Sequence, residues 1–179
     1  MELGEAKGFL AQEGNNANNM MAAIGQAEHT YTPLQLSVYL SSIVNGGSRY
    51  EAHLLDSVRA FYTGEVLASH RTKVMDRVEF SDTTYDLLIE GMRQVVSESD
   101  TLTRTFRNVP VTVGGKTGTA QVDGKTDNAL FCGFAPLNDP EIVGSCVLEG
   151  GAVGARAATP VAKVMETYFK KQAESVSAE

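Results

Sequence analysis

Gly114-Gly115-Lys116-Thr117-Gly118-Thr119-Ala120 is the most informative motif in this sequence. It follows residues 109–113, a short β-branched run that predicts a strand. Two glycines before a lysine let the backbone approach another molecule closely. Lys116 supplies a positive charge, and the hydroxyls of Thr117 and Thr119 supply hydrogen bonds, so the stretch suits a carboxylate. A strand with free N–H and C=O groups can also pair with an extended peptide.

Two other interpretations compete for this stretch. A phosphate-binding loop also ends in Gly-Lys-Thr, but it requires a glycine five positions before Gly115, where this chain has Pro110. Residues 119–125 are also a poor helix start, whereas a phosphate loop leads into a helix whose N-terminus holds the anion. Nucleotide binding is therefore disfavoured. A surface turn with a solvated lysine is the other alternative for the motif taken alone.

The segments around the motif predict a sheet and helices. Two apolar runs, 128–135 and 141–148, are separated by Pro136-Leu137-Asn138-Asp139-Pro140, which predicts a hairpin. Apolar residues at helical spacing predict helices over 33–45, 82–97 and 160–171, two of them opening with a Thr-Pro cap. Gly46-Gly47 should end the first helix. Three antiparallel strands and a closing helix indicate an α+β fold, an antiparallel sheet with helices packed on its faces.

The other segments predict less regular structure. Residues 4–30 show little periodicity, and Asn15–Asn19 is expected to be an exposed loop. Residues 49–72 favour strands, with a turn near Thr63-Gly64. Residues 97–108 are polar and are expected to form a loop. The end of the chain, 172–179, is a polar tail that we expect to fray.

Composition excludes several classes of function. The 179 residues are enough for one domain, and the apolar and charged shares, 42% and 21%, are those of a globular protein. The net charge of −7 and the lack of a basic run argue against a nucleic-acid partner. No apolar run is long enough to cross a bilayer, and residues 1–25 lack a signal-peptide pattern. The scattered histidines and the two cysteines do not predict a metal or a cofactor.

The two cysteines lie on the predicted hairpin. If the turn is centred near Asn138 and Asp139, facing residues have numbers that sum to about 277 or 278. Cys132 and Cys146 sum to 278, so they are expected to face each other at a separation that permits a disulfide. Two packed free thiols are the alternative.

The motif and its surroundings resemble the high-molecular-weight, class B penicillin-binding transpeptidases. Lys116-Thr117-Gly118-Thr119-Ala120 is similar to the third signature of penicillin-binding proteins and serine β-lactamases. Four further segments resemble the family: Ile24-Gly25-Gln26, Thr32-Pro33-Leu34-Gln35-Leu36, Phe131-Cys132-Gly133-Phe134-Ala135-Pro136 and Ala158-Thr159-Pro160-Val161-Ala162. The resemblance covers residues 3–171, the C-terminal half of such a domain.

The resemblance implies an enzyme that crosslinks peptidoglycan. A serine attacks the D-Ala-D-Ala end of a stem peptide, and β-lactams mimic that peptide. Lys116, Thr117 and Thr119 would bind the terminal carboxylate, and Gly118 would leave room for the ligand. The main-chain N–H of Thr119 would be one oxyanion-hole donor. No cofactor is implied, and the full-length protein would act on the extracytoplasmic face of the bacterial membrane.

The nucleophile of the family is missing from this sequence. No serine is followed by lysine three residues later or by asparagine two residues later, so neither Ser-x-x-Lys nor Ser-x-Asn is present. Both motifs are expected upstream of Met1. Residues 1–171 would then need the upstream half of the domain as a partner, would be inactive alone, and would leave a sheet edge bare. A non-catalytic peptide-binding module, and a β-lactamase or D,D-carboxypeptidase relative, are the alternatives.

Overall fold

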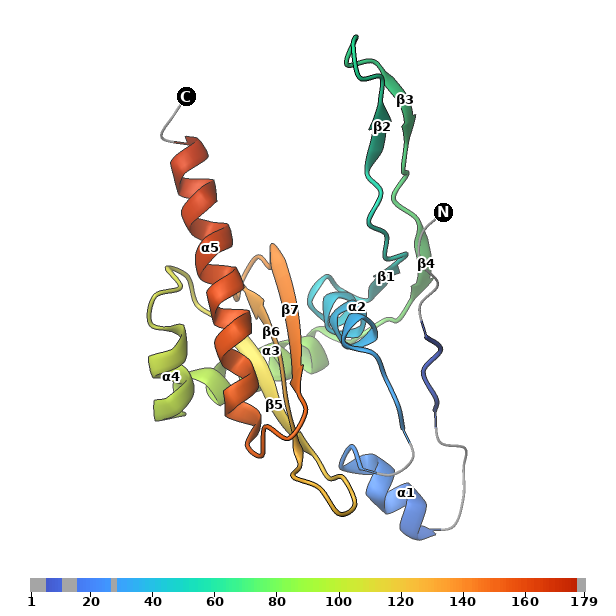
Figure 1. The fold of residues 1–179 in the computed structure, drawn as a ribbon. Coiled ribbons are helices and arrows are strands. Elements are labelled where there is room, and N and C mark those ends of the chain that lie inside the picture. The colour runs from blue at the N-terminus through green and yellow to red at the C-terminus, as the bar shows by residue number, and fades with distance from the viewer. Residues whose placement is uncertain (1–5, 11–15, 27–28, 177–179) are drawn as a thin grey trace.

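The computed structural model describes residues 6–10, 16–26 and 29–176. Helices pack around a three-stranded antiparallel sheet, and a narrow arm projects from one side (Figure 1). The elements of the body are α2 (Pro33–Val44), α3 (Asp82–Ser97), α4 (Asp100–Phe106), β5 (Gly114–Ala120), β6 (Asn128–Ala135), β7 (Ile142–Leu148), η1 (Gly154–Ala157) and α5 (Ala158–Val176). This arrangement confirms the predicted α+β class.

The sheet has the strand order β5-β6-β7. The predicted hairpin is therefore confirmed as β6 and β7, and all three strands are antiparallel. Apolar residues are buried on both faces of the sheet. On one face, Phe131 is buried against Phe106 of α4 and Met165 of α5 in the larger core cluster. On the other face, Phe134 packs with Leu40 of α2.

Helix α2 begins and ends where local chemistry predicts. The Thr32 hydroxyl accepts a hydrogen bond from the main-chain N of Gln35 at 3.1 Å, and the Gln35 side chain accepts one from the N of Thr32 at 3.0 Å. This reciprocal pair satisfies donors that the first turn leaves free. The chain leaves the helix through Gly46 and Gly47, whose φ values of 80° and 101° favour glycine.

The segment between α3 and β5 differs from the prediction. Residues 97–108 were expected to form a loop, but residues 100–106 form α4, capped by Ser99. Leu102 and Phe106 lie one turn apart and are both buried, so this short helix is held by packing rather than by its polar sequence. The strand predicted over residues 109–113 is also wrong. Residues 109–111 form a bend, residues 112–113 have no regular structure, and the strand begins at Gly114.

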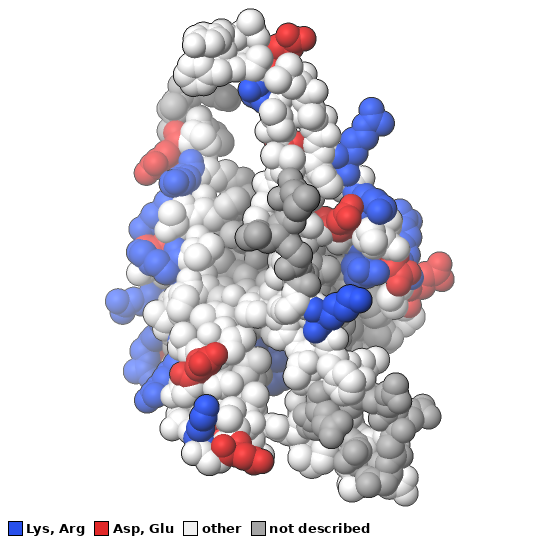
Figure 2. All heavy atoms as spheres, turned by 45° about the vertical axis from the view of Figure 1, so that its right-hand side comes forward, with Lys and Arg blue, Asp and Glu red and all other residues white. Residues whose placement is uncertain are grey.

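The arm spans residues 48–77 and contains two short antiparallel pairs. β1 (Ser48–Tyr50) pairs with β4 (Val74–Arg77), and β2 (Ser57–Arg59) pairs with β3 (Val66–Ser69). The predicted turn is confirmed, with Gly64 at a φ of 72°. Phe61 and Tyr62 at the tip are 93% and 95% exposed, and their rings meet edge to face with the centroids 5.2 Å apart. Figure 2 shows the tip at the top of the molecule as a mostly white lobe with an acidic side chain at its edge.

The N-terminal region contains a helix that the sequence did not predict. α1 (Asn16–Ala23) includes most of the segment expected to be an exposed loop; Asn15 lies outside the described residues. Among the buried core residues of the described chain, none belongs to α1. The helix ends at Ala23 and is followed by a turn that contains Gly25, whose φ is 78°.

The two cysteines do not face each other. Cys132 lies opposite Ser145, and Cys146 lies opposite Phe131, so facing residue numbers sum to 277 and the expected pairing is off by one residue. A one-residue shift moves a side chain to the other face of a sheet. Cys132 therefore contacts the cluster around Phe134 and Cys146 the cluster around Phe131, and both thiols are free.

Helix α5 is longer than the sequence predicts. It starts at Ala158 and continues to Val176, so residues 172–176, expected to fray, are helical. Residues 177–179 of the predicted tail lie outside the described residues. In the described part of the chain, no helix combines the length and the apolar character that a membrane span requires.

Candidate ligand-binding edge of the sheet

Strand β5 carries all four residues that the sequence analysis selected: Lys116, Thr117, Gly118 and Thr119. Within the described chain its only strand neighbour is β6, so β5 is an edge strand. Side chains alternate along a strand, which places both threonines on one face and Lys116 on the other. The motif is thus part of a sheet and not of a surface turn. Turns rather than a helix follow it, which contradicts the phosphate-loop alternative.

The two glycines before the lysine are explained by packing inside the chain. A Cβ atom at Gly114 would lie 2.5 Å from Cζ of Phe134, and one at Gly115 would lie 2.5 Å from Cζ of Phe131. Both glycines are buried. The aromatic rings on the two faces of the sheet therefore require glycine at both positions. This differs from the sequence interpretation, which assigned the glycines to contact with another molecule.

Lys116 has an exposed side chain at this edge. Its Nζ donates a hydrogen bond to the carbonyl oxygen of Thr117 at 3.0 Å. None of the ion pairs found among the described residues includes Lys116. An ammonium group has three donors, so one main-chain acceptor leaves it free to bind an anion.

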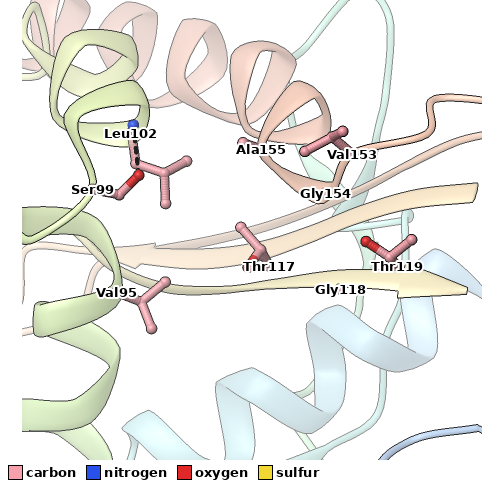
Figure 3. A pocket seen from close by; sticks show the side chains of 9 residues that line it. All are labelled: Val95, Ser99, Leu102, Thr117, Gly118, Thr119, Val153, Gly154 and Ala155. Atoms are coloured by element: carbon pink, nitrogen blue, oxygen red, sulfur yellow. Dashed lines mark hydrogen bonds between the residues drawn. The ribbon is translucent and has the colours of Figure 1, made fainter.

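A pocket of about 310 Å³ lies on the threonine side of β5. Its floor is Thr117–Thr119, and Figure 3 shows both threonine side chains on the side of the strand where Val153, Gly154 and Ala155 lie. The opposite wall comes from α3 and α4 and consists of Val95, Ser99 and Leu102. The pocket therefore combines hydroxyl groups from the strand and the α4 cap with apolar walls.

Two glycines shape the pocket in different ways. A Cβ atom at Gly154 would lie 2.5 Å from the carbonyl oxygen of Gly118, so η1 can approach β5 closely only because residue 154 is glycine. A Cβ atom at Gly118 would meet only the Cβ of Leu130, at 3.4 Å, which is an ordinary contact. The fold of this chain thus requires glycine at 154 but not at 118.

Cys132 lies opposite Lys116 on the neighbouring strand. Burial raises the pKa of the Cys132 thiol, because burial disfavours the charged thiolate. The thiol is therefore neutral at physiological pH and does not neutralise the charge of Lys116.

Several residues at this site were missed by the sequence analysis. Ser99 and Leu102 were missed because residues 97–108 were expected to form a loop, although Ser99-Asp100 followed by Leu102 and Phe106 is a detectable helix signal. Val95 lies on the predicted helix α3, but nothing local shows that it lines a pocket. Gln26 donates a hydrogen bond from Nε2 to the carbonyl oxygen of Thr119 at 3.1 Å. No local pattern predicts a contact between residues 93 positions apart.

Residues 1–166 match the family described as the penicillin binding protein transpeptidase domain. The chain belongs to this transpeptidase family. Penicillin-binding protein 2B of Streptococcus pneumoniae is 32% identical over 77% of this chain and 22% of its own length. Peptidoglycan D,D-transpeptidase MrdA of Haemophilus influenzae is 28% identical over 89% of the chain and 27% of its own length. The chain thus spans about a quarter of the length of these relatives.

Solved structures of penicillin-binding proteins share the fold. Penicillin-binding protein 2B from Streptococcus pneumoniae strain R6 superimposes with a TM-score of 0.74 at 28% identity, over 92% of this chain and 29% of that chain. An imipenem acyl-enzyme complex of penicillin-binding protein A from M. tuberculosis gives a TM-score of 0.81 at 24% identity, over 92% and 37% of the two chains. The second likeness shows the fold alone.

Proposed function

We propose that this chain is the C-terminal, substrate-binding part of a serine D,D-transpeptidase that crosslinks peptidoglycan. Residues 1–171 would hold the terminal carboxylate of a D-Ala-D-Ala stem peptide, or the carboxylate of a β-lactam. The observation that carries the proposal is the position of Lys116 on an exposed edge strand, without an acidic partner among the described residues, next to the hydroxyls of Thr117 and Thr119. The names of the relatives support the reaction class.

Each residue of the motif has a distinct role in this proposal. Lys116 attracts the carboxylate, and the threonine hydroxyls donate hydrogen bonds to it. Gly118 keeps a side chain away from the bound ligand. The main-chain N–H of Thr119 donates to the oxyanion, and one such donor contributes about 3 kcal/mol in related acyl-transfer chemistry. The attacking serine comes from outside these 179 residues, because Ser-x-x-Lys is absent from the sequence.

The other part of the domain is the natural partner of this chain. Within the described residues, β7 is paired only with β6, so its outer edge is available to a further strand. Pairing there would complete the sheet and cover an edge that otherwise favours association between chains. The complete enzyme would act on the extracytoplasmic face of the bacterial membrane.

Binding of a D-Ala-D-Ala peptide tests the carboxylate site. We expect diacetyl-L-lysyl-D-alanyl-D-alanine to shift the main-chain NMR signals of Thr117 and Thr119. Lys116→Ala should weaken binding about 10- to 100-fold, because a hydrogen bond to a charged group is lost. Lys125→Ala, an exposed lysine in the loop after β5, is the matched control. If the C-terminally amidated peptide bound as tightly as the peptide with a free carboxylate, the proposed carboxylate site would be contradicted.

Labelling with a fluorescent penicillin tests the assignment of the nucleophile. The 179-residue chain alone is expected to show no covalent label. A labelled band that survives denaturation would mean that a residue of this chain acts as the nucleophile. A non-catalytic binding module is the second candidate, favoured by the missing Ser-x-x-Lys. Co-expression with the coding region upstream separates the two, since only the transpeptidase would then become labelled.

A further inference from the structure

The side chain of Gln26 contacts β5, the strand on which the proposed ligand would bind. Its Nε2 donates to the carbonyl oxygen of Thr119 at 3.1 Å, and because Gln26 is not part of β6, this donor comes from outside the sheet ladder. An extended peptide that adds to an edge strand places its own N–H groups at the main-chain acceptors of that strand. The side chain of Gln26 thus stands where a main-chain N–H of the peptide would stand.

We propose that the carboxamide of Gln26 is a displaceable plug on the ligand-binding edge of β5. In the unliganded chain it occupies the carbonyl oxygen of Thr119, and it leaves when an extended peptide pairs with the strand. This inference rests on the proposed function of the Lys116–Thr119 edge. The Gln26 side chain would compete with the peptide for that edge.

The plug is fixed to α1 by the turn that ends this helix. The N of Gly25 donates to the carbonyl oxygen of Ala22 at 3.0 Å, and the N of Gln26 donates to that of Met21 at 3.0 Å. Together with the positive φ of Gly25, 78°, these two hydrogen bonds form a Schellman motif. Gln26 therefore moves together with α1 rather than as a free loop residue.

Helix α1 is weakly held, so its displacement costs little. It has eight residues, and helices shorter than about 12 residues are marginal in water without tertiary packing. Met20 of α1 and Ile24 in the turn after it are 72% and 71% exposed, and α1 lies apart from the helices that pack on the sheet (Figure 1). Segments with so few buried contacts open at low free energy.

The Gln26 variants test the plug in the full 179-residue chain. Gln26→Ala and Gln26→Met remove the donor, and each should tighten binding of diacetyl-L-lysyl-D-alanyl-D-alanine about 2- to 10-fold, the equivalent of one neutral hydrogen bond. Gln172→Ala is the matched control, because Gln172 also donates one Nε2 hydrogen bond, to Glu141 at 2.8 Å, but on α5. In the wild-type chain, the peptide should shift the side-chain NH₂ signals of Gln26.

The outcomes separate this inference from the proposed function. If wild type and both Gln26 variants bind equally, and the Gln26 signals do not move, the plug is overturned while Lys116-dependent binding stands. If the variants bind more weakly, Gln26 is a clamp and the plug is also overturned. If the peptide binds neither wild type nor the variants, the proposed function fails and the inference fails with it.

Discussion

The ring of Phe131 on β6 lies across the main chain of Gly115 on β5, so close that a Cβ atom at Gly115 would be 2.5 Å from Cζ of Phe131. The same ring packs against Phe106 of α4, with the centroids 5.4 Å apart. The residue directly before Lys116 is therefore fixed by the core. Gly115 therefore links the packing on this face of the sheet to the position of the exposed Lys116.

Replacement of Gly115 by alanine should destabilise the fold. The added methyl group has to displace a buried aromatic ring, and overpacking of this kind costs about 1–3 kcal/mol. Urea unfolding followed by circular dichroism measures the change. Gly118→Ala is the control, since its Cβ would meet only Leu130 Cβ at 3.4 Å, and we expect no loss of stability. Equal losses in the two variants would show that the Phe131 contact is not responsible.

The sequence predicted elements that have strong local signals. Thr32-Pro33 and Gly46-Gly47 defined α2 at both ends, because caps and positive φ values are local chemistry. The sequence-based prediction failed for elements whose formation depends on tertiary packing. α4 has a polar sequence and forms because Leu102 and Phe106 are buried. β5 contains three glycines, and at Gly114 and Gly115 the facing aromatic rings leave no room for a Cβ atom.

The candidate site was predicted only in part for the same reason. The residues from Lys116 to Thr119 are contiguous and could be identified from the motif. The pocket walls come from segments distant in sequence, and the Gln26 contact with Thr119 spans 93 residues. The register of the hairpin could be estimated only to within one residue, which was enough to place Cys146 on the wrong face.

The cysteines should remain reduced within one folded chain. Cys132 and Cys146 lie on opposite faces of the sheet, so a disulfide between them would require the sheet to break. After mild oxidation, alkylation under denaturing conditions should add two groups to the monomer by mass spectrometry, one for each free thiol. A monomer that takes up no alkylating reagent until it is reduced would contradict this register.

Replacement of Ala152 by glycine should stabilise the fold. Its φ of 63° is in the left-handed region, which disfavours a residue with a Cβ atom. Ala152→Gly should raise the free energy of unfolding by about 0.5–1 kcal/mol, the relief of strain less the entropy that glycine loses. Ala120→Gly in β5 is the control and should lower it by about 0.5–1 kcal/mol. The same sign for both substitutions would rule out backbone strain as the cause.

Glu166 should make the stability of the chain depend on pH. Hydrogen bonds from Lys170 and Lys163 lower the pKa of this carboxyl group, whose side chain is 10% exposed. A lowered pKa in the folded state means that the stabilisation is present above the ordinary pKa of glutamate and is lost as the pH falls through the lowered value.

Glu166→Gln tests this dependence. The variant should be less stable than wild type at neutral pH, and the difference should vanish as the pH falls below the lowered pKa. Urea unfolding at a series of pH values measures both. Glu174→Gln, in the exposed end of α5, should show a smaller difference at neutral pH. A deficit for Glu166→Gln that stays constant down to acidic pH would assign the effect to packing instead.

The tip of the arm is a suitable place to insert a tag into this chain. Among the residues that the structure describes, its strands pair only with one another, and its tip contributes nothing to either apolar core. Exposed loop tips accept insertions well. A short tetracysteine tag or an affinity peptide inserted after Tyr62 should therefore leave the edge at Lys116 intact, so that the chain can be immobilised or made fluorescent without touching either terminus.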